Sequence, residues 1–296
     1  MEISAKLVKE LRDKTNSGMM DCKKALAECE CDLEKAVDWL RQKGLMTARK
    51  RAGRATKEGL IVAGVSADQK TGALVELNCE TDFVAKNEGF QKLAADVVAY
   101  LLANETPADV EALLTKSLAS GTIDDALKGL VGTIGENMNL RRFAVKKADG
   151  GSFLHTYIHG PGRLGVMVEM NVEKTGPAAE ELAHNLAMQI AAANPVALTP
   201  EEVPADVLER EKNIFRAKLA ESGKPENMWD KIMVGQINKF YAEVVLLQQA
   251  YVKDDKKTIA QVLKDAAADC GKAEIKSFTR FQLGEELPGE ESGDEE

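Results

Sequence analysis

The sequence has few aromatic residues and few cysteines, and each shortage excludes a class of protein. Phenylalanine, tyrosine and tryptophan together make up 5% of the 296 residues, too few for an extended platform on which bases stack. The cysteines are odd in number and form no Cys-x-x-Cys pair: Cys22, Cys29, Cys31, Cys79 and Cys270. A disulfide scaffold or a structural zinc site is therefore not expected, and the pattern is typical of the reducing cytoplasm.

Long apolar runs and an excess of positive charge are also missing. No stretch approaches 18 apolar residues, so no membrane-spanning helix is expected, and the first ten residues lack the apolar core of a secretory signal. With 39 basic and 48 acidic residues the net charge is −9, which argues against general affinity for nucleic acid. The composition is that of a globular chain, and the length favours two or more folding units.

Residues 1–41 have the pattern of three short helices. Asp32 is placed to cap the third of them, which directs Leu33, Val37 and Leu40 to one face. A unit of about 40 residues is small for an independent core, so we expect it to gain stability by docking.

Residues 42–57 are predicted to be a basic linker. With the residue before them they contain no acid and seven basic side chains: Arg41, Lys43, Arg49, Lys50, Arg51, Arg54 and Lys57. Two interpretations are open, a site for RNA or the ribosome and a solvated helix end followed by a linker. The second is favoured because no aromatic side chains interleave the charges.

The sequence contains an internal repeat. Residues 72–81 (GALVELNCET) align without gaps with residues 165–174 (GVMVEMNVEK), and Gly, Val, Glu, Asn and Glu recur at matching places. Upstream, the β-like run 60–65 matches 153–158. We therefore expect two copies of one unit, which starts with paired strands, continues into helices and returns through a late strand.

The repeat defines the expected architecture. A third echo, Arg142-Phe143 against Arg280-Phe281, lies late in each copy. The fold class predicted is α+β: after the three-helix unit come a first subdomain, 58–148, and a second, 149–284, each with a small antiparallel sheet.

The second copy carries an insertion, and the chain ends in an acidic segment. Residues 203–248 contain two amphipathic patterns interrupted by a Gly/Pro turn at 222–225, so an antiparallel helical hairpin is expected. Whether the hairpin packs on the body or projects towards a partner is left open. Residues 285–296 carry seven acids among Gly, Pro and Ser and are predicted to be a disordered tail.

Two apparent catalytic or metal patterns do not carry their usual chemistry. Residues 160–165 match G-x-G-x-x-G, the pattern of a dinucleotide site in an oxidoreductase, which requires a helix directly after Gly165. A strand-like run follows instead, so a hairpin turn is predicted. His155 and His159 flank a predicted strand and His184 lies on a helix elsewhere, so zinc is not expected.

Thr81, Asp82, Phe83 and Val84 directly follow the first repeated strand. The second copy has Lys-Thr-Gly-Pro at the matching positions 174–177, so the unit needs neither the acid nor the ring there. An aromatic side chain beside a carboxylate is then a candidate for contact with a partner. The alternative, that Phe83 covers the local helix over 90–102, is equally open on this comparison.

Two long, unbroken segments stand out, residues 11–26 (LRDKTNSGMMDCKKAL) and residues 76–86 (ELNCETDFVAK). They resemble the first and the second signature of the bacterial elongation factor Ts family. The resemblance extends to about residue 287. Some relatives continue in a further helix, which the remaining PGEESGDEE is not expected to form.

The resemblance implies a guanine-nucleotide exchange factor for elongation factor Tu, the GTPase of translation elongation, with no covalent chemistry, cofactor or metal of its own. It implies that the chain binds the GDP-bound partner, disturbs the partner's Mg²⁺ and phosphate site and so promotes release of GDP. The complex would then persist until GTP binds. Nucleic-acid and membrane partners are not expected, and a homo-oligomer is left open.

The same resemblance assigns residues to the interface. Thr81, Asp82, Phe83 and Val84 would enter the partner near its magnesium. Residues 1–41 would be a ubiquitin-associated (UBA)-like domain that docks on the nucleotide domain, where Met20 is better suited than Met19 to closing the small core. The other residues at or near the interface would be Arg12, Met19, Met20, Lys23, Ile134, Gly135 and His159.

Overall fold

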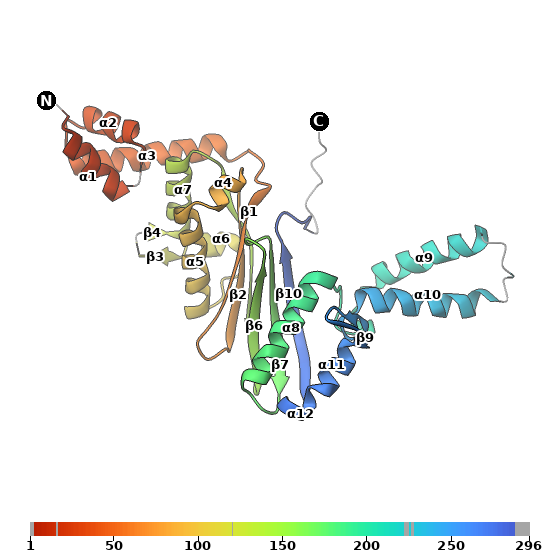
Figure 1. The fold of residues 1–296 in the computed structure, drawn as a ribbon. Helices are drawn as coiled ribbons and strands as arrows, with labels where there is room; N and C mark the ends of the chain where they lie inside the picture. Colours follow the sequence, from red (N-terminus) through yellow and green to blue (C-terminus); the bar gives the residue numbers. More distant parts are fainter. Residues whose placement is uncertain (1–2, 16, 120, 222–224, 226–227, 288–296) are drawn as a thin grey trace.

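The computed structural model describes residues 3–15, 17–119, 121–221, 225 and 228–287. Helices and small antiparallel sheets alternate along the chain, so the coarse fold class is α+β as predicted. The three N-terminal helices and a helical arm extend from opposite sides of two central sheets (Figure 1).

The N-terminal unit consists of α1 (Ala5–Thr15), α2 (Met19–Glu28) and α3 (Leu33–Arg51). Asp32 caps α3 as predicted, because its carboxylate accepts hydrogen bonds from two backbone N–H groups of the first turn. Small and aliphatic side chains form its core: Val8, Leu11, Cys22, Ala25, Leu26, Ala36 and Leu40.

The third helix is longer than predicted, and residues 42–51 of the expected linker are helical. Small residues explain the difference. Gly44 and Ala48 are buried, and the backbone of α3 packs on that of α7 (Ile123–Ile134). A Cβ atom built on Gly132 would lie 2.3 Å from the Cα atom of Gly44. The two helices can therefore cross this closely only because Gly132 lacks a side chain, whereas a Cβ atom on Gly44 would make ordinary contact at 3.5 Å.

The first sheet has the strand order β1-β2-β5 and is antiparallel throughout. Two helices, α5 (Glu88–Ala103) and α7, pack with it around a core that includes Phe90. The remaining elements of this part are β1 (Glu58–Val65), β2 (Thr71–Cys79), α4 (Asp82–Ala85), α6 (Val110–Leu114), β3 (Ser117–Leu118), β4 (Gly121–Thr122) and β5 (Met138–Lys147).

The second sheet has the order β10-β7-β6 and is packed against α8 (Pro177–Ala193). Residues 160–163 form the turn between β6 (Ser152–His159) and β7 (Leu164–Val172), as predicted. A strand therefore follows the glycine-rich segment, which rules out the dinucleotide-site reading. The later elements are η1 (Pro200–Glu202), η3 (Leu246–Gln248), β8 (Ala250–Tyr251), β9 (Asp254–Thr258), α11 (Ile259–Asp265), α12 (Ala267–Cys270) and β10 (Ala273–Gln282).

The two sheets pack face to face. Their shared core contains Ile61, Leu74, Leu154, Met167 and Phe281. A Cβ atom on Gly72 would lie 2.6 Å from the Met167 sulfur, and one on Gly165 would lie 2.6 Å from a methyl group of Ile61. Glycine at these two positions thus sets how closely the sheets approach.

The Arg-Phe echo of the repeat does not fall at equivalent positions. Arg142 lies opposite Glu76 in the first sheet, whereas Ser277 lies opposite Glu169 in the second and Arg280 is three residues further along. Glu76 is fully buried and binds Arg142 at 2.6 Å. The second sheet replaces this ion pair by a hydrogen bond from the Ser277 hydroxyl to Glu169 at 3.0 Å.

The predicted tail begins too early. Glu285 binds Arg142 at 2.7 Å and lies 3.7 Å from Arg280. The N–H of Gly284 donates to buried Glu76 at 2.9 Å. These contacts hold the chain on the body through Glu285, because the buried charges of both sheets require partners. The rest of the tail, residues 288–296, lies outside the described residues.

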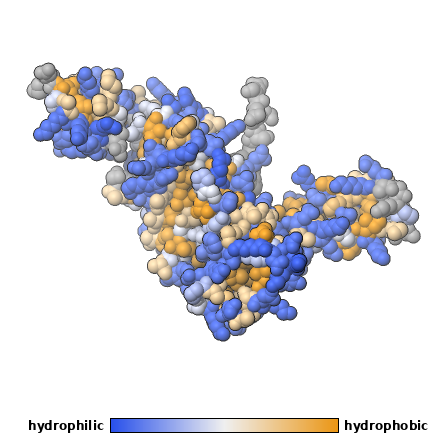
Figure 2. Space-filling view, viewed as in Figure 1, coloured by the Kyte–Doolittle hydropathy of each residue, from blue (hydrophilic) through white to orange (hydrophobic). Residues whose placement is uncertain are grey.

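The insertion forms α9 (Ala205–Glu221) and α10 (Trp229–Val244), which lie side by side and project from the second sheet (Figure 1). The base of this arm is packed around Phe240, Val245, Ala197 and Val203. Along its length, hydrophobic residues are exposed among hydrophilic ones (Figure 2). The arm thus projects rather than packing along the body.

Candidate partner-binding site

The segment after β2 is a single helical turn, α4 (Asp82–Ala85), which the sequence pattern did not reveal. It has two faces. Val84 is 5% exposed and belongs to the core of the first sheet, whereas Phe83 is 79% exposed. Phe83 therefore does not cover α5, and its ring is presented to solvent.

Thr81, directly before this turn, fixes it to the end of α7. Its backbone N–H donates to the carboxylate of Glu136 at 3.0 Å, and its hydroxyl donates to the same carboxylate at 2.8 Å. Cys79 is fully buried, and burial raises the pKa of its thiol to about 12. It acts as a small apolar core residue, which leaves no reactive thiol at this strand end.

Glu80 ties the same segment to α3. Its carboxylate accepts the N–H of Asn137 at 2.6 Å and lies 3.4 Å from Arg51 and 3.2 Å from Arg54. The Asn137 hydrogen bond, followed by Arg54, lowers the pKa of Glu80. Glu80 and Thr81 together hold the base of α4 on both neighbouring helices.

Asp82 is ionised and accessible. Lys86 donates to its carboxylate at 2.7 Å, and the Asp82 side chain is 50% exposed. This hydrogen bond is the main cause of its lowered pKa, with a smaller contribution from Arg163. The Lys86 ammonium also lies 5.8 Å from the centre of the Phe83 ring, so the ring and the carboxylate share one cation.

The structure brings Ile134, Gly135 and the turn after His159 to this segment. Gly135 ends α7 with φ of +85° and directly precedes Glu136, the anchor of Thr81. His159 is exposed at the end of β6, with its Nδ1 2.8 Å from the Tyr157 hydroxyl. In the following turn Arg163 binds Glu58 of β1 at 2.8 Å.

The predicted N-terminal contacts form a second patch. Arg12, Met19, Met20 and Lys23 are all exposed on α1 and α2. Met20 is 74% exposed and Met19 60%, so neither closes the small core and the alternative role, suggested above for Met20 in particular, does not apply. Leu26 and its buried neighbours already fill that space. Both patches lie beside α3, because Asp21, between Met20 and Lys23, binds Lys43 of that helix and Glu80 of the first patch contacts Arg51 at its end.

The comparisons with known proteins agree on one family. The family described as "Elongation factor TS" matches residues 80–285. The chain is 49% identical over 285 residues to "Elongation factor Ts" of Clostridium botulinum (strain Alaska E43 / Type E3), covering 96% of this chain and 93% of the relative. It is 46% identical over 299 residues to the protein of that name from Nitratidesulfovibrio vulgaris (strain DP4), covering 99% and 100%. The chain belongs to the elongation factor Ts family.

In this member of the elongation factor Ts family, Arg41, Lys43, Arg51 and Arg54 of the basic segment contact acids of the same chain. Arg41 binds Asp125 at 3.2 Å, and Lys43 binds Asp21. Arg51 and Arg54 share Glu80. Cations that already hold carboxylates are poor phosphate ligands, which weakens the interpretation of this segment as an RNA site.

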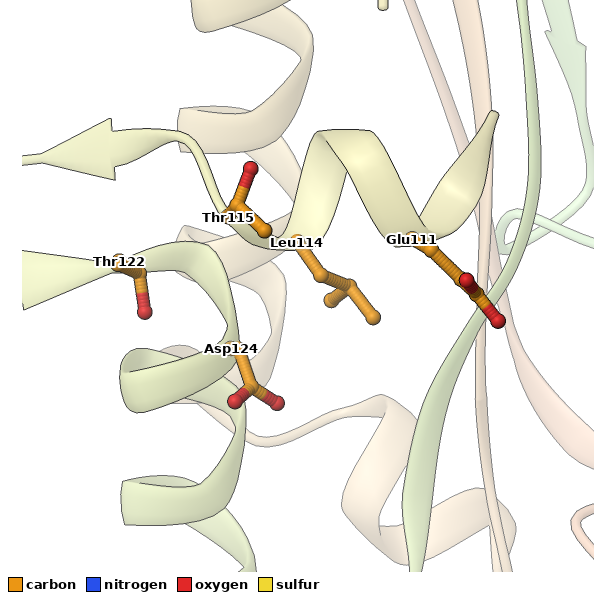
Figure 3. A pocket seen from close by; sticks show the side chains of 5 residues that line it. All are labelled: Glu111, Leu114, Thr115, Thr122 and Asp124. Carbon is orange, nitrogen blue, oxygen red and sulfur yellow. The ribbon is translucent and has the colours of Figure 1, made fainter. Parts of the chain in front are cut away.

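A surface hollow of about 400 Å³ lies at the opposite end of α7 from Gly135 (Figure 3). It is lined by Glu111, Leu114, Thr115, Thr122 and Asp124. The 12 residues of α7 place it about 18 Å from the Phe83 segment. None of the predicted contact residues lines it.

Among the described residues, every helix is too short or too polar to cross a membrane.

Proposed function

We propose that the chain promotes release of guanine nucleotide from elongation factor Tu by inserting the exposed ring of Phe83 into its partner. Membership of the elongation factor Ts family makes the chain a nucleotide exchange factor for that GTPase. The observation that carries the proposed mechanism is a ring 79% exposed on a turn whose base is anchored to two helices.

The target of the ring is the magnesium site of the partner. Mg²⁺ bridges nucleotide phosphates and protein ligands and demands near-ideal octahedral geometry. A wedge that displaces those ligands by an ångström or so degrades the coordination without covalent chemistry. Thr81 and Val84 position the wedge, since Thr81 is fixed to Glu136 and Val84 is buried in the core.

Asp82 contributes charge. Its carboxylate stays ionised beside Lys86, and in the complex it acts on the groups around the partner's metal. We assign Ile134 and Gly135, which precede Glu136, and His159, which precedes the turn that carries Arg163, to the same interface, where they widen the contact. The ring supplies part of the effect and this wider interface the rest.

The three-helix unit is the second point of attachment. We assign it as a UBA-like domain that docks on the nucleotide domain through Arg12, Met19, Met20 and Lys23. Two exposed methionines suit a partner surface because their flexible, polarisable side chains adapt to it. The two sheet-containing parts are assigned as copies of one unit, of which only the first kept the wedge.

Coupling between the two ligands of elongation factor Tu is reciprocal. If the chain weakens nucleotide binding, nucleotide weakens binding of the chain by the same factor. Incoming GTP therefore ejects the chain, which acts repeatedly and is no hydrolase. We place this cycle in the cytoplasm, with the GTPase as partner and without direct contact to nucleic acid.

The test is release of a fluorescent GDP from elongation factor Tu, with and without the chain and with excess unlabelled nucleotide. Acceleration that saturates with the concentration of the chain is expected, and no acceleration would refute the function. Binding through an apolar wedge should weaken only modestly between low and moderate salt, whereas a steep loss would favour the RNA alternative.

A further inference from the structure

All three histidines of the sequence lie in one cluster, which corrects the expectation that His184 is remote. His155 is on β6 and His184 on α8, and the Nε2 atom of His155 lies 3.2 Å from the Nδ1 atom of His184. The two rings meet edge-on, with an interplanar angle of 87°. Tyr157, between the two strand histidines, packs edge-on against His184 and binds His159.

We propose that His155 and His184 form a two-histidine chelate for a divalent transition-metal ion of the zinc class. Imidazole nitrogens are ligands that such ions prefer. Among the described residues, no three His, Cys, Asp or Glu side chains lie close enough together to bind one metal ion. Water therefore fills the remaining coordination positions, and the site is an accessory one.

The distance between the two nitrogens fits a chelate. Two nitrogens bound to one tetrahedral zinc ion at about 2.05 Å are about 3.3 Å apart, and the pair is observed at 3.2 Å. In the present geometry the nitrogens face each other across a hydrogen bond. One of these two nitrogens carries the proton of the hydrogen bond, so in the chelate that ring is in its other tautomer, with the proton on its second nitrogen. A modest rotation of each ring then directs both lone pairs to a common ion.

The surroundings permit entry of a cation. His184 is exposed and His155 half-buried, so the pair opens to solvent at the edge strand of the second sheet. Glu180 precedes His184 by one helical turn and lies close enough to act on the charge of His155. A bound ion would link β6 to α8, so it should stabilise this part of the fold by mass action.

The test uses the full chain, freed of metal by a chelator, with Zn²⁺ alone as the probe. Calorimetry at pH 7.5 should show one site, weakened at pH 5.5 because protons compete for both imidazoles. His155→Gln and His184→Gln should each weaken binding about tenfold or more. His159→Gln should bind as the parent does, since its Nδ1 is engaged by Tyr157.

Cys29 and Cys31 provide a further control, because they are the other closely spaced pair of zinc-preferring side chains. The Cys29→Ser/Cys31→Ser variant should retain the site, and loss of binding in that variant would overturn the proposal. A readout without substitution comes from ¹⁵N-histidine NMR, which has three residues to report. Zn²⁺ should shift His155 and His184 most, and unchanged spectra or a shift confined to His159 would contradict us.

Discussion

Replacing Phe83 by alanine separates a role in exchange from a role in folding, because the ring is 79% exposed. Full burial of a phenylalanine side chain contributes about 1.5–3 kcal/mol. The exposed part corresponds to roughly 1.2–2.4 kcal/mol of that contribution, which becomes available only in the complex. At about 1.36 kcal/mol for each power of ten, Phe83→Ala should lower kcat/KM for exchange about 8- to 60-fold.

The same arithmetic predicts a small effect on folding. The fraction of the ring already covered contributes roughly 0.3–0.6 kcal/mol, which shifts the melting temperature by about 1–2 °C in a chain of this size. The assay is stopped-flow release of fluorescent GDP from elongation factor Tu at several concentrations of the variant, together with thermal unfolding followed by circular dichroism.

Val252→Ala is the matched control, because it truncates another exposed apolar side chain, 53% exposed at the β8–β9 turn. It should exchange as the parent does. A large fall in melting temperature of Phe83→Ala with normal exchange per folded molecule would show that the ring is structural and would refute the wedge. Parental exchange at parental stability would refute it as well.

Three further perturbations test other parts of the argument. Asp82→Ala should slow exchange less than Phe83→Ala at unchanged stability, and equal rates for variant and parent at every magnesium concentration would remove its role. On α7, Gly132→Ala forces a Cβ atom to 2.3 Å from the α3 backbone and should lower the free energy of unfolding by about 1–3 kcal/mol. The control Gly129→Ala adds a Cβ atom that meets nothing within 4 Å and should raise the free energy of unfolding by up to about 1 kcal/mol. Similar melting temperatures for the two variants would contradict this. Burial, and then His184, lower the pKa of His155 below 6.5, so the folded state resists its protonation and stability should fall as pH drops below 6.5. His155→Gln should flatten that dependence, and an unchanged pH profile would count against it.

Local signals in the sequence predicted elements whose causes are local. Asp32 predicted the start of α3 correctly, because a side-chain cap binds backbone N–H groups within the next three residues. The turn at 160–163 was predictable because alternating strands flank its glycines. The length of α3 was not, since glycine is a poor helix former, and the packing that holds Gly44 in the helix involves Gly132, 88 positions away in the sequence.

The candidate site likewise has features that the sequence predicted and features that depend on contacts between distant segments. The comparison of the two repeats singled out Asp82 and Phe83 but left the exposure of the ring open, because exposure depends on what packs beside α4. Its anchors are long-range: Glu136 lies 55 residues beyond Thr81. The histidine pair was missed for a related reason, since His155 and His184 meet only when α8 packs on β6.

The anchoring of α4 connects the two patches mechanically. Arg51 is the last residue of α3 and contacts Glu80, next to the base of the wedge, while the other end of α3 belongs to the three-helix unit. A ring on a loose loop would be pushed aside on contact, and ordering the loop would consume binding free energy. Here Glu80 and Thr81 fix the base in advance, so energy gained when Phe83 is buried remains available to strain the partner. In the proposed complex, the N-terminal patch on α1 and α2, which pack on the same helix, sets where on the partner that strain is applied.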